Sequence, residues 1–460
     1  MGAVQARKMD SEDKKEFPEE ESEASSLLYS PAVVQRVHIE GLKKTKADFV
    51  TKQVKKIFEA TTFGEALAYT YEARENLQNL EIFKDIDIFI DTSSGPKAHP
   101  DGLDITFTIE EKKLLTSNIG TQVGNNEGTM VFGLKMNNLM GRGENVNADV
   151  GFGTRTKTNY QLGFTKPFHG KSVKSFRVVA HKTATEFPMS SFKEASQGVD
   201  CQYNFSSLIG KHSIGWEGTW REITGLSKKT SFTVREQAGH SLKSSLLHTL
   251  VSDSRDSIAF PTEGSLLRIS QEVAGLGGDV RFIKHNVELQ ESLEVAQDVV
   301  MSWSLQAGIL NTLPNEQSKI NDRFFLGGPL SVRGFQMKGL GPRSEGDSLG
   351  GDAYWAAGLH LYTPLPFRPG EGSFGDHIKT HGFINAGNLT QLNCTLPWRE
   401  RLDPLRSGVR WSYGFGLVFI LGVARVEVNY CLPKGVHSDD GVNHGLQVNT
   451  YEVLYPFLLG

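Results

Sequence analysis

The chain has 460 residues, with 49 Lys and Arg against 53 Asp and Glu and a formal net charge of −4. This mildly acidic balance excludes the strongly basic surface on which nucleic-acid binding depends. The mean hydropathy is slightly polar at −0.31, and no run of about 18 apolar residues predicts a membrane-spanning helix. Cys201, Cys394 and Cys431 are odd in number and far apart, which excludes a disulfide framework and a cysteine metal site.

The N-terminal segment is acidic. Residues 1–30 contain eight acidic and four basic side chains, without the apolar core of a secretory signal or the Arg-rich pattern of a mitochondrial presequence. Ala6 stands where N-myristoylation prefers Ser or Thr. We interpret residues 1–32 as a disordered acidic tail.

Residues 33–111 predict a small α+β domain. The expected elements are a strand at 34–39, helices at 45–58 and 63–80, and strands at 83–90 and 103–109. Apolar residues recur at helical spacing in the helices and alternate in the strands. Pro100, Asp101 and Gly102 supply turn chemistry before the last strand.

From Leu115 onward the apolar residues alternate with polar ones. In 301–309, for example, Met301, Trp303 and Leu305 share one face, while Ser302 and Ser304 share the other. The predicted strands are 115–123, 127–136, 144–153, 157–166, 173–183, 197–205, 211–222, 241–251, 264–275, 281–294, 297–309, 352–363, 378–387, 408–420, 423–431 and 444–454. The segment 230–235 is also strand-like, but we assign it to a long connection.

Two architectures fit this alternation. A β-sandwich alternates in the same way, but its strands average about 5–6 residues. Several of the predicted strands reach the 9–11 residues that span a bilayer, and sixteen is the even number expected of a closed barrel. We therefore predict that residues 112–460 form a membrane β-barrel, a 16-stranded antiparallel transmembrane barrel.

A long segment, 310–351, separates two of these strands. Loops longer than about 12–15 residues are uncommon and are usually functional or disordered. This one contains an apolar cluster and paired glycines, with Arg333 between Val332 and Gly334. We interpret it as a loop that folds back and docks with Arg333 at its tip; the alternative is a surface loop with a solvated arginine.

This loop resembles the long sixth loop of the outer-membrane barrel insertases, which has an aromatic-rich approach, a Gly-Gly pair and a Val-Arg-Gly-Phe tip. The matching approach residues are Arg323, Phe324, Gly327 and Gly328, and the tip residues are Val332, Arg333, Gly334 and Phe335. Residues 33–111 resemble the POTRA module that precedes such barrels. Stretches at 124–128, 239–245, 350–355 and 361–370 resemble the core barrels of the mitochondrial sorting and assembly machinery.

The resemblance implies a function. The chain would insert and fold β-barrel precursor proteins into the mitochondrial outer membrane through a seam between the first and last strands, without nucleotide hydrolysis and without being an enzyme. The client would pair with the first strand, whose residues are Leu115, Thr116, Ser117, Asn118, Ile119, Gly120, Thr121, Gln122 and Val123. Implied partners are metaxin-like peripheral subunits, the inner-membrane contact-site (cristae-organising) complex and the lipid bilayer. The POTRA domain and N-terminus would face the intermembrane space.

The sequence departs from the family pattern at two places. Bacterial relatives offer the loop arginine an aspartate on a late strand, whereas this chain has Asn385 there. An amide accepts a hydrogen bond but does not neutralise a guanidinium, so another partner is expected or a weaker contact. The C-terminal segment 450–460 includes Pro456 and does not continue as a regular closing strand.

Two other functions remain open. A passive diffusion channel would use the same barrel as its pore, although it needs neither a POTRA domain nor a docked loop. An enzyme in the lumen would need a catalytic motif, and we find no nucleophile elbow, paired-carboxylate motif or nucleotide-binding loop. We also predict no metal site and no cofactor.

Overall fold

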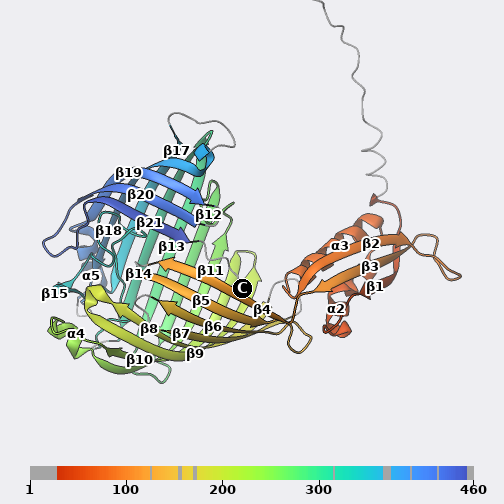
Figure 1. Cartoon of the computed structure of the whole chain (residues 1–460), viewed down its shortest axis with the longest axis horizontal. Helices are drawn as coiled ribbons and strands as arrows, with labels where there is room; N and C mark the ends of the chain where they lie inside the picture. The colour runs from red at the N-terminus through yellow and green to blue at the C-terminus, as the bar shows by residue number, and fades with distance from the viewer. Residues whose placement is uncertain are drawn as a thin grey trace, which may run out of the picture. The chain divides into compact units, whose positions relative to one another are not determined.

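The structure is a computed structural model, described here over residues 28–124, 127–153, 158–168, 174–313, 316–365, 374–393, 396–421 and 424–452. Most of the predicted acidic tail and the end of the C-terminal segment lie outside these residues. The chain divides into two compact units (Figure 1), one ending at Lys113 and also including Met140–Gly143, the other beginning at Leu114. Within the described ranges, no helix is long and apolar enough to cross a membrane.

The N-terminal unit is built on a three-stranded sheet in the order β1-β3-β2. Its elements are β1 (Val33–Glu40), α2 (Ala47–Val54), η1 (Lys55–Glu59), α3 (Phe63–Gln78), β2 (Phe83–Thr92) and β3 (Gly102–Glu111). β1 runs parallel to β3, and β2 runs antiparallel to it. The core contains Phe49, Leu77 and Phe107, which are fully buried. Because α2, α3 and the sheet all contribute to this core, the unit has its own hydrophobic interior.

The helix α3 begins after the N-cap residue Thr62. Thr62 Oγ1 accepts a hydrogen bond from the backbone N–H of Glu65 at 3.2 Å. In return, a Glu65 carboxylate oxygen accepts from the backbone N–H of Thr61 at 2.9 Å. The first bond satisfies an N–H group that the helix leaves without a partner, and the second holds the residue before the N-cap, so together they mark the start of the helix.

The second unit is one sixteen-stranded sheet in which each strand pairs antiparallel with the next along the chain. Its strands are β4 (Leu115–Gly124), β5 (Glu127–Met136), β6 (Asn145–Gly153), β7 (Asn159–Phe168), β8 (Lys174–Phe187), β9 (Phe192–Ser207), β10 (Gly210–Thr224), β11 (Gly239–Asp253), β12 (Gly264–Ala274), β13 (Phe282–Ala296), β14 (Val299–Thr312), β17 (Ala353–Pro364), β18 (Ile378–Thr390), β19 (Arg410–Leu421), β20 (Ala424–Lys434) and β21 (Gly445–Glu452). The predicted antiparallel sheet of sixteen strands is confirmed. The strand-like segment 230–235 forms most of a short helix, α4 (Phe232–Glu236), so its assignment to a connection is also correct.

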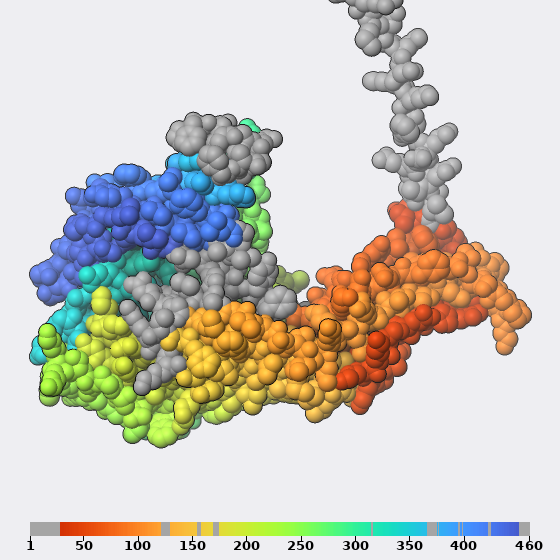
Figure 2. All heavy atoms as spheres, in the orientation of Figure 1, coloured from red at the N-terminus to blue at the C-terminus, as the bar shows by residue number. Residues whose placement is uncertain are grey.

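The two faces of this sheet differ in polarity. We call the face that the long loop contacts the inner face. Ion pairs lie on it, such as Lys243 with Glu217 at 3.0 Å and His181 with Asp200 at 3.2 Å. The outer face carries exposed apolar side chains, among them Phe415, which is 67% exposed. Figure 2 shows the side chains of β6 to β10 (orange-yellow to yellow-green) packed into a continuous outer wall. Alternation with an apolar outer face and a polar inner face suits a wall between lipid and a wet lumen.

Candidate functional site at the tip of the long loop

The long loop connects β14 to β17 and folds into a defined structure over its described residues, 316–352. Two isolated bridges hold it together, Phe324 with Gly351 and Leu326 with Leu340. Gly327 and Gly328 have φ angles of 105° and 107°, a conformation that side chains with a Cβ rarely adopt. A Cβ on Gly327 would also lie 2.7 Å from the carbonyl oxygen of Gln336. The paired glycines therefore allow the tight turn that brings the chain back.

Apolar side chains fix the loop against the inner face. Leu326, Val332 and Phe335 are at most 1% exposed and belong to one cluster with Leu310 on β14 and Leu389 on β18. Burying a side chain of this size contributes about 1.5–3 kcal/mol. Apolar packing therefore contributes to the stability of the docked loop, and the polar contacts fix its orientation.

Arg333 lies at the loop tip and is buried. Its Nη2 donates to Glu427 Oε2 on β20 at 2.8 Å. Its Nη1 lies 3.5 Å from Asn385 Oδ1 on β18, which is long for a hydrogen bond between a cation and an amide. The guanidinium also stands over the Phe383 ring at 5.2 Å from the ring centroid. Glu427 therefore supplies the negative charge that Asn385 lacks.

Glu427 is shared by two arginines. Its side chain is fully buried and also accepts from Arg425 on the same strand and from Asn429 Nδ2 at 3.0 Å. Arg425 in turn donates to the Tyr362 hydroxyl at 2.5 Å. A buried carboxylate between two guanidiniums is strongly stabilised, because each cation compensates for the loss of hydration of the anion.

The tip also contacts the last strand of the sheet. The backbone N–H of Gly334 donates to Gln447 Oε1 on β21 at 3.2 Å. The turn before β21 adds two backbone hydrogen bonds, from Asn443 N to the Gly334 carbonyl at 2.9 Å and from Gln336 N to the Gly441 carbonyl at 2.8 Å. The loop tip is therefore bonded both to β20 and to β21, the last strand of the barrel.

The approach to the tip has a second ion pair. Asp322 accepts two hydrogen bonds from Arg221 on β10, at 2.6 and 3.1 Å, and both side chains are buried. Lys284 Nζ donates to the Asp322 carbonyl at 2.8 Å. Arg323 bonds within the loop, to Ser318 and to the Leu349 carbonyl. A bidentate arginine–carboxylate pair fixes orientation as well as distance, so the base of the loop is held on β10 and the tip on β20.

The first strand, β4, contains the predicted client-binding residues 115–123. It pairs with β5 along its whole length, and the side chains from Thr121 onward are outside the described residues. β4 and β21 are the two ends of the strand order, and their Cα atoms approach within 8 Å. Among the described residues no hydrogen-bonded register joins them, whereas every other neighbouring pair has one.

Comparison with known proteins places this arrangement in a family. Residues 138–450 match the Omp85 superfamily domain. The chain belongs to the Omp85 superfamily. Sorting and assembly machinery component 50 homolog B of Xenopus laevis is 47% identical over 97% of this chain and 98% of its own length. The human homolog of that component is 48% identical over 94% of this chain and 93% of its own.

The Omp85 fold is also visible in a solved structure. The crystal structure of BamA from Haemophilus ducreyi lacking POTRA domains 1–3 superposes with a TM-score of 0.72 at 17% identity, over 91% of this chain and 85% of that one. At this identity the likeness concerns the fold. The resemblance drawn from the loop motif and the predicted membrane barrel fold are confirmed.

Sequence reasoning did not identify three residues of the site in this Omp85 chain: Glu427, Gln447 and the Arg221 that holds Asp322. The signal for Glu427 was present, since its strand alternates charged and apolar residues and so turns Glu427 inward. The sequence does not state which inward carboxylate faces Arg333, because the two are separated by 94 positions. In the described ranges, no group of three or more His, Cys, Asp or Glu side chains could hold a metal ion.

Proposed function

We propose that this chain inserts and folds β-barrel precursor proteins into the mitochondrial outer membrane, through a lateral seam between β4 and β21 and without nucleotide hydrolysis. The observation that carries the proposal is the missing register between β4 and β21, among the described residues, in a sheet where every other pair of neighbouring strands has one. The high identity to sorting and assembly machinery components supports it.

The chemistry of the seam is an exchange of backbone hydrogen bonds. In lipid, each unpaired N–H or C=O costs several kcal/mol. A precursor strand entering the bilayer lacks partners, and the free edge of β4 offers a row of them. Pairing with β4 stabilises the precursor until its own strands close, and no other energy source is required.

In this mechanism the loop supports the side of the seam that stays in place. Its tip holds β20 through Glu427 and β21 through Gln447. The rigid packing of Val332 and Phe335 keeps these contacts in place. We propose that the loop keeps β20 and β21 in register while β4 exchanges its partner.

We propose that residues 33–111 are a POTRA domain facing the intermembrane space, preceded by an acidic tail at 1–32 and followed by the barrel at 112–460. The order of β1, α2, α3, β2 and β3 supports this assignment. β1 and β2 are the edges of the sheet, and an edge strand can bind an extended chain by strand addition. Metaxin-like subunits and the inner-membrane contact-site complex are the partners we propose by resemblance.

A cross-linking experiment tests the seam. A porin-type precursor is arrested during assembly, and cysteines are placed at Ile119 on β4 or at Phe132 on β5, which lie directly opposite each other, in a chain without its native cysteines. The terminal strand of the precursor should cross-link to position 119 and much less to 132, because β5 is already paired on both sides. Equal yields at both positions contradict the seam. Normal porin assembly after depletion of the chain contradicts the function itself.

A further inference from the structure

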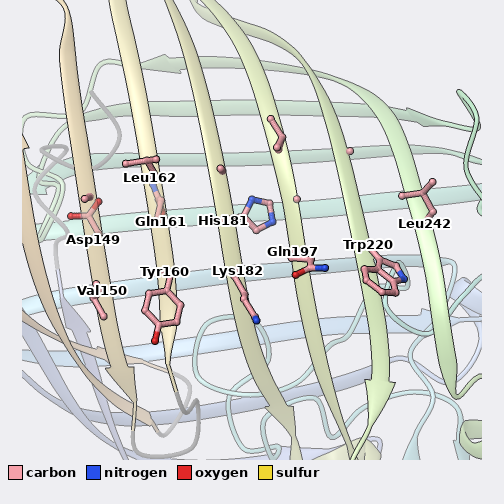
Figure 3. Close-up of a pocket in the computed structure, with 15 residues that line it drawn as sticks. Asp149, Val150, Tyr160, Gln161, Leu162, His181, Lys182, Gln197, Trp220 and Leu242 are labelled. Atoms are coloured by element: carbon pink, nitrogen blue, oxygen red, sulfur yellow. The ribbon is translucent and has the colours of Figure 1, made fainter.

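The outer face of the barrel has a shallow, widely open hollow of about 660 Å³ across β6 to β11. We call it the outer groove and define it by Tyr160, Leu162, Lys182, Gln197, Trp220 and Leu242. Figure 3 shows these side chains on the near side of the strands, with the opposite wall of the barrel behind them. They belong to the outer face. His181, the residue before Lys182, contacts Asp200 on the inner face, so Lys182 and the residues paired with it point outward.

Four polar side chains form one row in this groove. Tyr160 pairs directly with Lys182, Lys182 with Gln197, and Gln197 with Trp220, so the four lie side by side on β7 to β10 (Figure 3). Side chains directly opposite on neighbouring strands have Cβ atoms about 4.5–5.5 Å apart. Each can donate a hydrogen bond. In the part of the chain that the structure describes, none of these four side chains has a hydrogen-bond or ion-pair partner.

Lys182 differs in this respect from two other lysines on the outer face of β7 to β9, whereas Lys174, which shares its face of β8, also lacks a carboxylate within 4 Å among the described residues. Lys166 has a carboxylate oxygen of Glu144 at 3.9 Å, and Lys193 has one of Glu186 at 3.4 Å. Lys182 has no carboxylate within 4 Å among the described residues. A cation on a lipid-facing wall is costly without a counter-ion, so its negative partner is expected to come from outside the chain.

The neighbouring row of the groove is apolar and contains small residues. Leu162 pairs with Ala180, Ala180 with Val199, and Val199 with Gly218. The short side chains of Ala180 and Val199 leave space between Leu162 and Leu242, which rise on either side in Figure 3. The side chains of this row are apolar, as contact with an extended hydrocarbon chain requires.

The order of the two rows matches the orientation of a lipid in a membrane. The polar row lies nearer the strand ends, where β8 turns into β9 at Pro188–Ser190, and the apolar row lies nearer the middle of the strands. Tyr and Trp are enriched at membrane–water interfaces, and Lys extends its charged end toward the water there. A ligand in this groove would have its charged group toward the rim and its chain toward the bilayer centre.

We propose that the outer groove binds one anionic glycerophospholipid, with its phosphate on Lys182, Gln197 and Tyr160 and an acyl chain over Ala180 and Val199. The site belongs to the leaflet at the barrel end from which the long loop leaves. It is independent of client insertion, since none of its residues lies at the seam or in the loop.

The test uses the full chain reconstituted in phosphatidylcholine vesicles that contain a minor share of phosphatidylglycerol brominated on its acyl chains. Bromine quenches tryptophan fluorescence at contact, and Trp220 lies in the groove. Quenching by brominated phosphatidylglycerol should exceed quenching by the same share of brominated phosphatidylcholine. Trp220→Phe should remove the excess. Equal quenching by both lipids in the native chain overturns the proposal.

Charge variants distinguish a specific lipid site at Lys182 from a general attraction of anionic lipid to the charged surface of the barrel. Lys182→Gln should lower the preference for phosphatidylglycerol about fivefold, the effect of one lysine near an anionic surface, while Lys182→Arg should retain most of it. Lys193→Gln is the matched control, and an equal loss there overturns the site. Inorganic phosphate should not reverse the excess quenching; if it does, the groove binds small anions rather than a lipid. An unchanged mobility shift on unheated gels shows that each variant is folded.

Discussion

The pair of Arg333 and Glu427 permits a quantitative test of how the loop is held. Glu427 is fully buried and faces two guanidiniums, those of Arg333 and Arg425. Glu427→Gln leaves both cations without this carboxylate, and breaking a buried pair from one side costs about 3–5 kcal/mol. Arg333→Ala leaves Glu427 bonded to Arg425, so its cost should be smaller, about 1–3 kcal/mol. We therefore expect Glu427→Gln to be the more destabilising substitution.

Two further variants refine this prediction. Arg333→Lys keeps the charge but loses the planar fork and the stacking over Phe383, so it should be less destabilising than Arg333→Ala. The double variant Arg333→Ala with Glu427→Gln should be more stable than the sum of the single effects implies, by roughly 0.5–3 kcal/mol. The double variant should lose less stability than this sum because Glu427→Gln leaves two cations without their carboxylate, and Arg333→Ala removes one of these cations.

The measurement is the free energy of unfolding in urea of the full chain in detergent micelles. Unfolding is followed by tryptophan fluorescence and by the loss of the folded band on unheated gels. Arg268→Ala is the control, because the Arg268 side chain is 47% exposed in its pair with Glu288 and such pairs contribute about 0–1 kcal/mol. The reasoning is refuted if Glu427→Gln is no more destabilising than Arg333→Ala, or if the two effects simply add.

Three more predictions concern other contacts. Asp322→Asn should destabilise the barrel by about 3 kcal/mol, because it removes the carboxylate that is bonded to the buried Arg221; the same urea assay measures it, and an unchanged midpoint contradicts a second anchor. Gly334→Ala should loosen the loop tip by about 1–2 kcal/mol, because Gly334 has a φ of 82°; faster proteolysis within the loop reports it, and native resistance contradicts it. In the N-terminal unit, burial alone would raise the pKa of Glu111, but hydrogen bonds from Thr45 and its neighbours outweigh burial and lower the pKa below its ordinary value of 4.5. The Glu111 carboxylate therefore stabilises the unit above pH 4.5 and loses this effect as pH falls through its lowered pKa. The difference in stability between the native unit and Glu111→Gln, measured by urea unfolding, should therefore shrink in acid. A difference that does not change with pH contradicts this prediction.

The strands could be predicted because each alternates in a way that its own residues display. The ends of the strands were harder to place. β9 begins at Phe192 rather than at 197, and β8 ends at Phe187 rather than at 183. These extra residues lie beyond the most regular alternation, where Phe187 and Phe192 turn inward and stack on each other at 4.7 Å. Periodicity therefore locates the middle of a strand better than its ends.

The partners of the loop could not be predicted in the same way. Arg221 and Asp322 are 101 positions apart, and their contact depends on the register of the strands and on the fold of the loop together. Neither the register nor the loop fold can be predicted from the residues next to Arg221 or Asp322 in the sequence. The motif around Arg333 indicated a docked loop because glycine conformation and apolar clustering are local properties. The identity of Glu427 as its partner depends on the position of β20, which lies next to β19 and two strands from β18 in the sheet.

The positions of the two ion pairs have a consequence for the proposed seam. Asp322 holds the loop base on β10, in the middle of the strand order, whereas Arg333 and Gly334 hold its tip on β20 and β21, at one end of it. The loop therefore links the last two strands to the far wall of the barrel. Because β21 is braced in this way and β4 is bonded to β5 alone among the described residues, β4 is the strand that can change its partner at lower cost. An edge that stays in place beside an edge that moves is the arrangement that sequential strand addition requires.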